Sequence, residues 1–118
     1  MARKDDSLLR NLQKEHIEGK LCLITGATSG IGKETAIGLL ELGAQVVITA
    51  RDIARGQAVQ REIQMKSGRS RVELFELDLS SKESIQQFVK NFTKRHKGLD
   101  LLINNAGVFH PERKESAD

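Results

Sequence analysis

The chain has 118 residues, 38% hydrophobic and 30% charged, which is the composition of one soluble globular domain with a modest core. Its formal net charge is +3, from 19 basic and 16 acidic residues that are interspersed, so no nucleic-acid partner is expected. With four Phe and no Trp or Tyr, it also lacks the aromatic platform on which single-stranded nucleic acids stack.

The sequence contains no signal for membrane insertion, secretion or disulfide bonding. No apolar stretch approaches the roughly 20 residues of a membrane span, and residues 1–20 lack the apolar core of a secretory signal. Cys22 has no partner for an internal disulfide and no zinc-site spacing, so a small buried side chain is expected there. An intracellular, by default cytoplasmic, setting is predicted.

The first elements are a polar arm, a strand and a helix. Residues 1–18 predict a loose arm or short helix, and the apolar run 20–25 predicts a buried parallel strand that ends in a turn. A helix is expected over residues 31–42, with Gly43 ending it. The expected apolar stripe of this helix is Ile31, Thr35, Leu39 and Leu42, widened by Ala36, Ile37 and Leu40.

The middle of the chain repeats this alternation. Residues 44–50 are rich in β-branched side chains and predict a strand, after which Asp52 is expected to cap a polar helix ending near Met65. The inner side of that helix is expected to carry Ala54, Ala58 and Ile63. Residues 67–70 predict a loop, and residues 71–79 a third strand.

The strongest helical pattern lies between Ser80 and Gly98. Either Ser80 or Ser81 is expected to cap this helix, and Gly98 is expected to end it after a basic last turn. Its predicted apolar face is Ile85, Phe88, Val89 and Phe92. Residues 99–107 predict a fourth strand with an apolar edge, and residues 111–118 an irregular polar tail.

This β-α-β-α-β-α-β order predicts an α/β fold with parallel strands and right-handed crossovers. It is typical of the N-terminal half of a Rossmann-type doubly wound sheet, with strand order 3-2-1-4. The dinucleotide-binding half-domain is expected to span residues 19–110.

Three glycines follow the first strand and open the first helix. Gly26, Gly30 and Gly32 would let the backbone turn sharply and approach a pyrophosphate at the helix N-terminus. A purely structural turn is the alternative. A P-loop is disfavoured because Gly32-Lys33 is followed by Glu34, where that motif requires Ser or Thr.

The end of the second strand bears on which dinucleotide is bound. Ala50 stands where an acid would bind the ribose 2′-hydroxyl of NAD, and Arg51 follows it. Arg51 can pair with a 2′-phosphate, so NADP(H) is predicted over NAD(H). The alternatives are an exposed Arg with no ligand, and a competing role for Asp52, which is better explained as the helix cap.

Two further strand ends carry candidate groups. Asp78 can accept a hydrogen bond from the adenine amino group, or it can simply cap the next helix. The run 104–107, Asn-Asn-Ala-Gly, places small residues where a cofactor would lie and amides where the sheet opens.

These segments together resemble the short-chain dehydrogenase/reductase family. The resemblance rests on "TGATSGIG" at 25–32, "DL" at 78–79 and "NNAG" at 104–107, and it covers about residues 17–110. Within the family, "ARD", "DLSS" and "LINNAGV" are most similar to the retinol dehydrogenase branch, whose members act on retinoid or related lipid carbonyls with NADPH. Members often carry an N-terminal membrane anchor, of which residues 1–20 show no sign.

The resemblance implies a cofactor role for residues in four segments. Residues 26–32 would carry the phosphates and ribose, Arg51 the 2′-phosphate, Asp78 and Leu79 the adenine, and Asn105 the nearby ribose. The full implied set is Gly26, Ala27, Thr28, Ser29, Gly30, Ile31, Gly32, Arg51, Asp78, Leu79, Asn105, Ala106 and Gly107.

The catalytic part of the family pattern is absent from this sequence. The family uses a Tyr-x-x-x-Lys pair, and this chain has no Tyr, so no catalytic residue is assigned. His16, His96 and His110 do not replace it as general acids. We expect the cofactor-binding fragment of an NADP-dependent oxidoreductase that acts on a carbonyl or alcohol. The alternative is a non-catalytic truncated product that binds dinucleotide weakly, or a protein partner through its open sheet edge.

Overall fold

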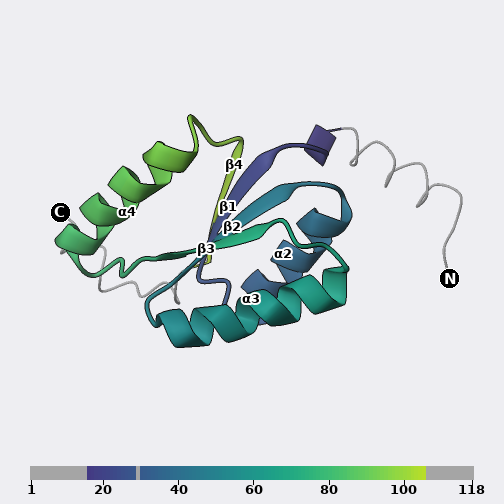
Figure 1. Ribbon diagram of the computed structural model, residues 1–118, viewed down its shortest axis with the longest axis horizontal. Helices are drawn as coiled ribbons and strands as arrows, with labels where there is room; N and C mark the ends of the chain where they lie inside the picture. Colours follow the sequence, from purple (N-terminus) through teal and green to yellow (C-terminus); the bar gives the residue numbers. More distant parts are fainter. Residues whose placement is uncertain (1–15, 29, 106–118) are drawn as a thin grey trace, which may run out of the picture.

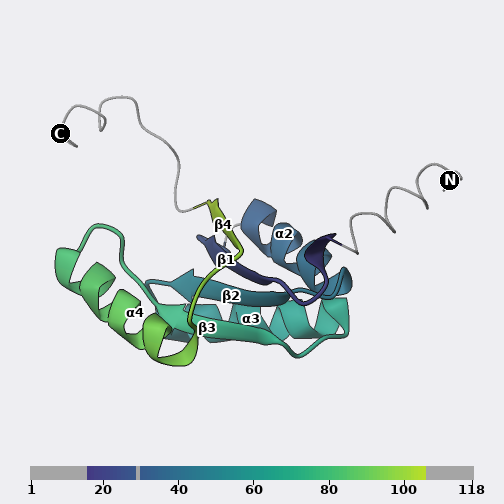
Figure 2. The same cartoon turned by 90° about the horizontal axis from the view of Figure 1, so that it is seen from above.

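The computed structural model describes residues 16–28 and 30–105, which form a four-stranded parallel sheet with helices on both faces (Figure 1). The order across the sheet is β3-β2-β1-β4, as Figure 2 shows from above. The predicted Rossmann-type half-sheet is confirmed.

The helices and strands are numbered as in Figure 1. The elements are β1 (Leu21–Thr25), α2 (Gly30–Glu41), β2 (Gln45–Ala50), α3 (Ile53–Ser67), β3 (Val72–Glu76), α4 (Lys82–Arg95) and β4 (Leu101–Asn104). Most of the predicted arm and all of the tail lie outside the described residues.

The core is divided into two parts by the sheet. Successive strand residues point to opposite faces, so Cys22 and Ile24 of β1 pack toward α2 and α3, whereas Leu21 and Leu23 pack toward α4. Figure 1 shows α4 on one side of the sheet and α2 and α3 on the other. Because both faces are covered, β1 is apolar almost throughout, as the sequence indicated.

Helix α2 ends as predicted, and three residues of its predicted apolar stripe, Ala36, Ile37 and Leu40, are buried against the sheet. Gly43 adopts a left-handed φ of 96°, and the following N–H, that of Ala44, donates to the Leu39 carbonyl at 3.1 Å. The predicted inward position of Ile31 is wrong, because its side chain is 76% exposed. The next residue, Gly32, packs directly against the turn that follows β1, and with Gly32 facing inward the side chain of Ile31 points to solvent. The buried residues of the helix are Gly32, Ala36, Ile37 and Leu40.

The predicted inner side of α3 is confirmed at Ile63, which is fully buried, and is wrong at two other positions. Ala54 and Ala58 are exposed, and the buried stripe is Gly56, Val59 and Ile63. A Cβ on Gly56 would lie 2.7 Å from the Ala50 Cβ, so the missing side chain is what lets α3 approach the sheet this closely. Asp52 is the N-cap as predicted, and the helix runs two residues past the predicted end at Met65.

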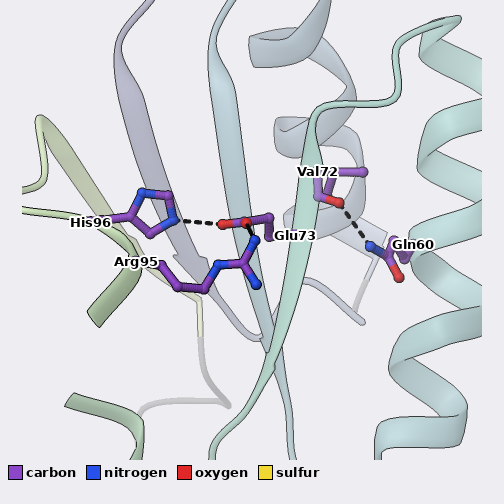
Figure 3. Close-up of polar contacts among 5 residues, drawn as sticks. All are labelled: Gln60, Val72, Glu73, Arg95 and His96. Carbon is purple, nitrogen blue, oxygen red and sulfur yellow. Dashed lines mark hydrogen bonds and ion pairs between the residues drawn. The ribbon is translucent and has the colours of Figure 1, made fainter. Parts of the chain in front are cut away.

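Helix α4 ends at Arg95, not at Gly98. His96 leaves the helix in an extended conformation; its ring lies tilted against Phe92 with a centroid distance of 5.0 Å, and its Nε2 lies 2.6 Å from Glu73 Oε1. Figure 3 shows Glu73 of β3 held between His96 and Arg95. On the opposite side of the same strand, the Gln60 amide of α3 donates to the Val72 carbonyl at 2.7 Å. Both contacts join helices to β3.

The predicted apolar face of α4 is only half buried. Phe88 and Phe92 are covered, but Ile85 is 36% and Val89 49% exposed. Phe75 of β3 packs edge-on against both phenylalanine rings, with centroid distances of 5.7 and 5.9 Å. This aromatic cluster fixes α4 on its face of the sheet and so positions the loop that leads into the helix.

Candidate cofactor-binding site

The four parallel strands end at one edge of the sheet, and the predicted site residues follow them there. Thr25 of β1 lies beside Asn104 of β4, and Ala50 of β2 lies beside Glu76 of β3. The glycine turn, Arg51, Asp78 and Asn105 therefore share this carboxyl edge, where ligands bind in open α/β sheets. Ser29, Ala106 and Gly107 lie outside the described residues.

The glycines of the turn have three different roles. Gly26 has a left-handed φ of 72°, which the chain needs in order to turn back after β1. A Cβ on Gly32 would lie 2.7 Å from the Gly26 carbonyl oxygen, so α2 packs directly against this turn. At Gly30, by contrast, a Cβ would meet nothing within 4 Å. The backbone at Gly30 is therefore open, as it is at Gly38 of the same helix, and leaves room for a ligand to approach.

Helix α2 adds a favourable electrostatic environment to this turn. It begins at Gly30 and carries no acidic residue in its first turn. The first backbone N–H groups of a helix have no partner within the helix, and the helix dipole favours an anion there. The described residues of the turn therefore fit a bound pyrophosphate in both shape and charge. A shallow hollow at the start of α2 is lined by Gly30, Ile31, Lys33, Glu34 and Thr35.

A hydrogen bond that the sequence analysis missed ties β1 to β4 at this edge. The buried hydroxyl of Thr25 donates to Asn104 Oδ1 at 2.7 Å, and the Asn105 N–H donates to the Thr25 carbonyl at 3.0 Å. These bonds hold Asn105, the predicted ribose neighbour, next to the glycine turn. The available signal was a polar residue at the end of an otherwise apolar strand.

Arg51 occupies the exposed position at the end of β2. Ala50 is buried, 6% exposed, and its Cβ packs against Gly56, which leaves Arg51 as the first side chain to reach solvent. Asp52 is engaged as the cap of α3, where its carboxylate accepts the Arg55 N–H at 3.3 Å. The acid that follows Arg51 in the chain is therefore engaged as the cap of α3.

Asp78 follows β3 and organises a turn; it is not the cap of α4. Its Oδ1 accepts the hydroxyl and the backbone N–H of Ser80, at 2.7 and 3.0 Å. Ser81 is the N-cap, so the alternative that Asp78 caps the next helix is wrong. The two bonds from Ser80, followed by the positive charge of Arg51, hold the pKa of Asp78 below its ordinary value of 3.8. Leu79 beside it is 45% exposed.

The other reactive side chains do not join this edge. His96 is engaged with Glu73 at the opposite end of α4, and Cys22 is fully buried. Burial, with a smaller effect from Asp100, raises the pKa of the Cys22 thiol, which disfavours the thiolate. Within residues 16–28 and 30–105, no group of His, Cys, Asp and Glu has the arrangement of a metal site.

A family model described as short chain dehydrogenase matches residues 20–118. The chain belongs to this family. The chain is 45% identical over 102 residues to retinol dehydrogenase 11 of Mus musculus, a match that covers 86% of the chain and 32% of the relative. The predicted likeness to the retinol dehydrogenase branch is thereby confirmed. The chain spans about a third of the length of the curated relatives it matches.

Solved structures of the family share this architecture. A metagenomic short-chain oxidoreductase in complex with NADP is 41% identical with a TM-score of 0.67, over 78% of this chain and 41% of that one. An NADH-dependent reductase complexed with NAD is 34% identical with a TM-score of 0.67, over 80% and 39% of the two chains. None of the described helices is both long and apolar enough to cross a bilayer.

Proposed function

We propose that this chain is the NADP(H)-binding part of a short-chain oxidoreductase, with residues 19–110 as its dinucleotide-binding unit. The observation that carries this proposal is the turn from β1 into α2. Gly26 turns the chain, Gly32 packs α2 against the turn, and Gly30 leaves open space above the N-terminus of the helix. Phosphate oxygens would accept hydrogen bonds from backbone N–H groups at the start of α2.

The preference for NADP(H) rests on Arg51. Relatives of known structure include complexes with NADP and with NAD, so family membership alone does not choose between the two. In this chain the exposed position after β2 is a guanidinium, and the neighbouring Asp52 is occupied by the cap of α3. A 2′-phosphate at this position would gain bidentate, charge-assisted hydrogen bonds from Arg51.

The remaining contacts are assigned from the geometry of the edge and from the family pattern. Asp78 would accept the adenine amino group, with the exposed side chain of Leu79 beside the ring. Asn105, fixed by its bond to the Thr25 carbonyl, would lie near the ribose. Thr28, Ser29, Ala106 and Gly107 are carried over from the family pattern alone.

The proposed reaction of the whole protein is hydride transfer between nicotinamide and the carbon of a carbonyl or alcohol, of the retinoid or lipid type. The bound cofactor supplies or accepts the hydride, and the residues of this chain bind and orient it. The retinol dehydrogenases among its relatives support this substrate class. The family's proton-donating Tyr does not occur among these 118 residues, so no residue here is assigned that step. The proposed compartment is intracellular.

A non-catalytic role is the alternative, and one observation favours it. Leu101 and Leu102 of the edge strand β4 are 37% and 57% exposed, so a protein partner could bind along this edge. Intact mass of the native protein separates the two hypotheses. A mass well above 13.1 kDa favours the oxidoreductase, and a stable 13.1 kDa species that binds nucleotide without turnover favours the alternative.

The cofactor assignment is tested by titrating the chain with NADPH and NADH. We expect NADPH to bind more tightly, and Arg51→Ala to reduce that preference about tenfold or more, because a charge-assisted pair contributes roughly 1.5–3 kcal/mol. Arg69→Ala is the matched control, since Arg69 is also exposed but follows the far end of α3. Equal binding of the two cofactors, or an unchanged preference in Arg51→Ala, would refute the role of Arg51.

A further inference from the structure

Asp78 is held by three serines at the start of α4. Its carboxylate Oδ1 accepts two hydrogen bonds from Ser80, from the hydroxyl at 2.7 Å and the N–H at 3.0 Å. Its backbone N–H donates to Ser84 Oγ at 2.8 Å, and its carbonyl accepts the Ser81 N–H at 3.0 Å. Both the backbone and the carboxylate of Asp78 are therefore positioned by residues at the beginning of one helix.

The hydroxyl groups of Ser80 and Ser81 have different partners. Ser81 caps α4 by accepting the Ser84 N–H at 3.1 Å, so the start of the helix does not depend on the Ser80 side chain. Ser80 is exposed, and its hydroxyl bonds to Asp78 alone among the described residues. The Ser80 hydroxyl thus orients the carboxylate without contributing a cap.

The bonds from Ser80 leave the other carboxylate oxygen available. Within the described part of the chain, Oδ2 of Asp78 receives no hydrogen bond from a protein donor. An ionised carboxylate can only accept hydrogen bonds, so Oδ2 suits a ligand group that donates. The charge of Arg51, which follows the neighbouring strand, favours the ionised form of Asp78.

We propose that Ser80 is a positioning residue, which fixes Asp78 Oδ1 so that Oδ2 accepts the exocyclic amino group of the cofactor's adenine. This inference rests on the proposed function, in which this sheet edge binds NADP(H). A held acceptor loses less conformational entropy when the ligand binds, and it discriminates against a purine that lacks the donor. A 6-oxo purine presents a carbonyl oxygen at this position and cannot make the bond. Ser80 therefore contributes to the preference for adenine.

The test compares two ligands that differ at this one group. NADPH and its hypoxanthine analogue, in which the 6-amino group is replaced by oxygen, are each titrated into the 118-residue chain and followed by nicotinamide fluorescence. Ser80→Ala should reduce the preference for NADPH over the analogue about fivefold, the value of one modest hydrogen bond. Affinity for the analogue should be nearly unchanged. Ser80→Thr keeps the hydroxyl and should restore the preference.

Ser81→Ala is the matched control. It removes the cap of α4 and should lower Tm while leaving the preference between the two ligands unchanged. If Ser80→Ala weakens both ligands equally, Ser80 has only a structural role and the inference is overturned. The same conclusion follows if wild type binds the two ligands equally well. If wild type binds neither ligand, the proposed function itself is overturned, and the inference with it.

Discussion

Replacing Gly32 by Ala directly tests how the glycine turn is built. An added Cβ would lie 2.7 Å from the Gly26 carbonyl oxygen and 2.8 Å from the Ala27 Cα, where ordinary contacts begin at 3.4 Å. Both neighbours are backbone atoms, so the turn itself would have to move. Such overpacking costs about 3 kcal/mol at the upper end of its range, and the better helix propensity of Ala offsets about 1 kcal/mol. We expect a net loss of about 2 kcal/mol.

Two glycines of the same helix provide matched controls. A Cβ on Gly38 meets nothing within 4 Å, so Gly38→Ala should stabilise the chain by about 0.5–1 kcal/mol through helix propensity alone. The Cβ of Gly30→Ala is equally unopposed, so this variant should fold normally. Its methyl group would nevertheless occupy the approach of the phosphate, and NADPH should bind more weakly.

Urea denaturation followed by circular dichroism gives the three stabilities, and NADPH titration gives the affinities. The reasoning fails if Gly32→Ala unfolds at the same urea concentration as wild type while Gly38→Ala is stabilised. That result would mean that the turn has room for a side chain, and that glycine is present there for another reason. Normal NADPH binding by Gly30→Ala would separately refute the phosphate position.

Other predictions concern the core, the strand ends and pH. Leu40 is 1% exposed on the inner face of α2, so Leu40→Ala should cost about 3 kcal/mol in urea denaturation, and a loss under about 1 kcal/mol would contradict its place in the core. Thr25→Val removes the donor to Asn104 and should cost about 1 kcal/mol, whereas Thr25→Ser should cost less; equal losses would mean that the hydroxyl is not what matters. The pKa of Asp78 is depressed, so its stabilising effect is present above its ordinary value of 3.8 and is lost as the pH falls through the lower folded value. Thermal unfolding between pH 5 and pH 2.5 (about the range in which carboxylates titrate) should therefore show a smaller fall in Tm for Asp78→Asn than for wild type.

Local sequence patterns determined the elements and their order. Apolar runs with β-branched residues marked the strands, and Gly43 and Asp52 marked helix ends through conformational freedom and a capping hydrogen bond. The sequence left Ser80 and Ser81 as alternative caps of α4, and the structure selects Ser81. Right-handed crossovers between parallel strands then dictated the order β3-β2-β1-β4. Because parallel strands end at one edge, the same reasoning brought the glycine turn, Arg51 and Asp78 together.

Tertiary packing decided which side of each helix is buried. In α3 the sequence placed Ala54, Ala58 and Ile63 on the inner side. Ile63 is buried, but Ala54 and Ala58 are exposed and the helix packs through Gly56, because only a residue without a side chain fits against Ala50. In α2 the contact of Gly32 with the turn rotates Ile31 into solvent. Helical periodicity predicts which residues lie on the same side of a helix, but it does not predict how closely the helix backbone approaches the sheet.

Contacts between distant segments decided the rest. Helix α4 ends at Arg95, and His96 beyond it pairs with Glu73 of β3, a partner 23 residues away that no local pattern contains. The bond from Thr25 to Asn104 joins residues 79 apart in the chain, and it forms only because β1 and β4 are neighbours in the sheet. The sequence by itself therefore determined the strands, the helices and the edge at which the cofactor would bind. Folding determined which side chains at that edge hold one another in place, because those contacts depend on distances that only the assembled sheet sets.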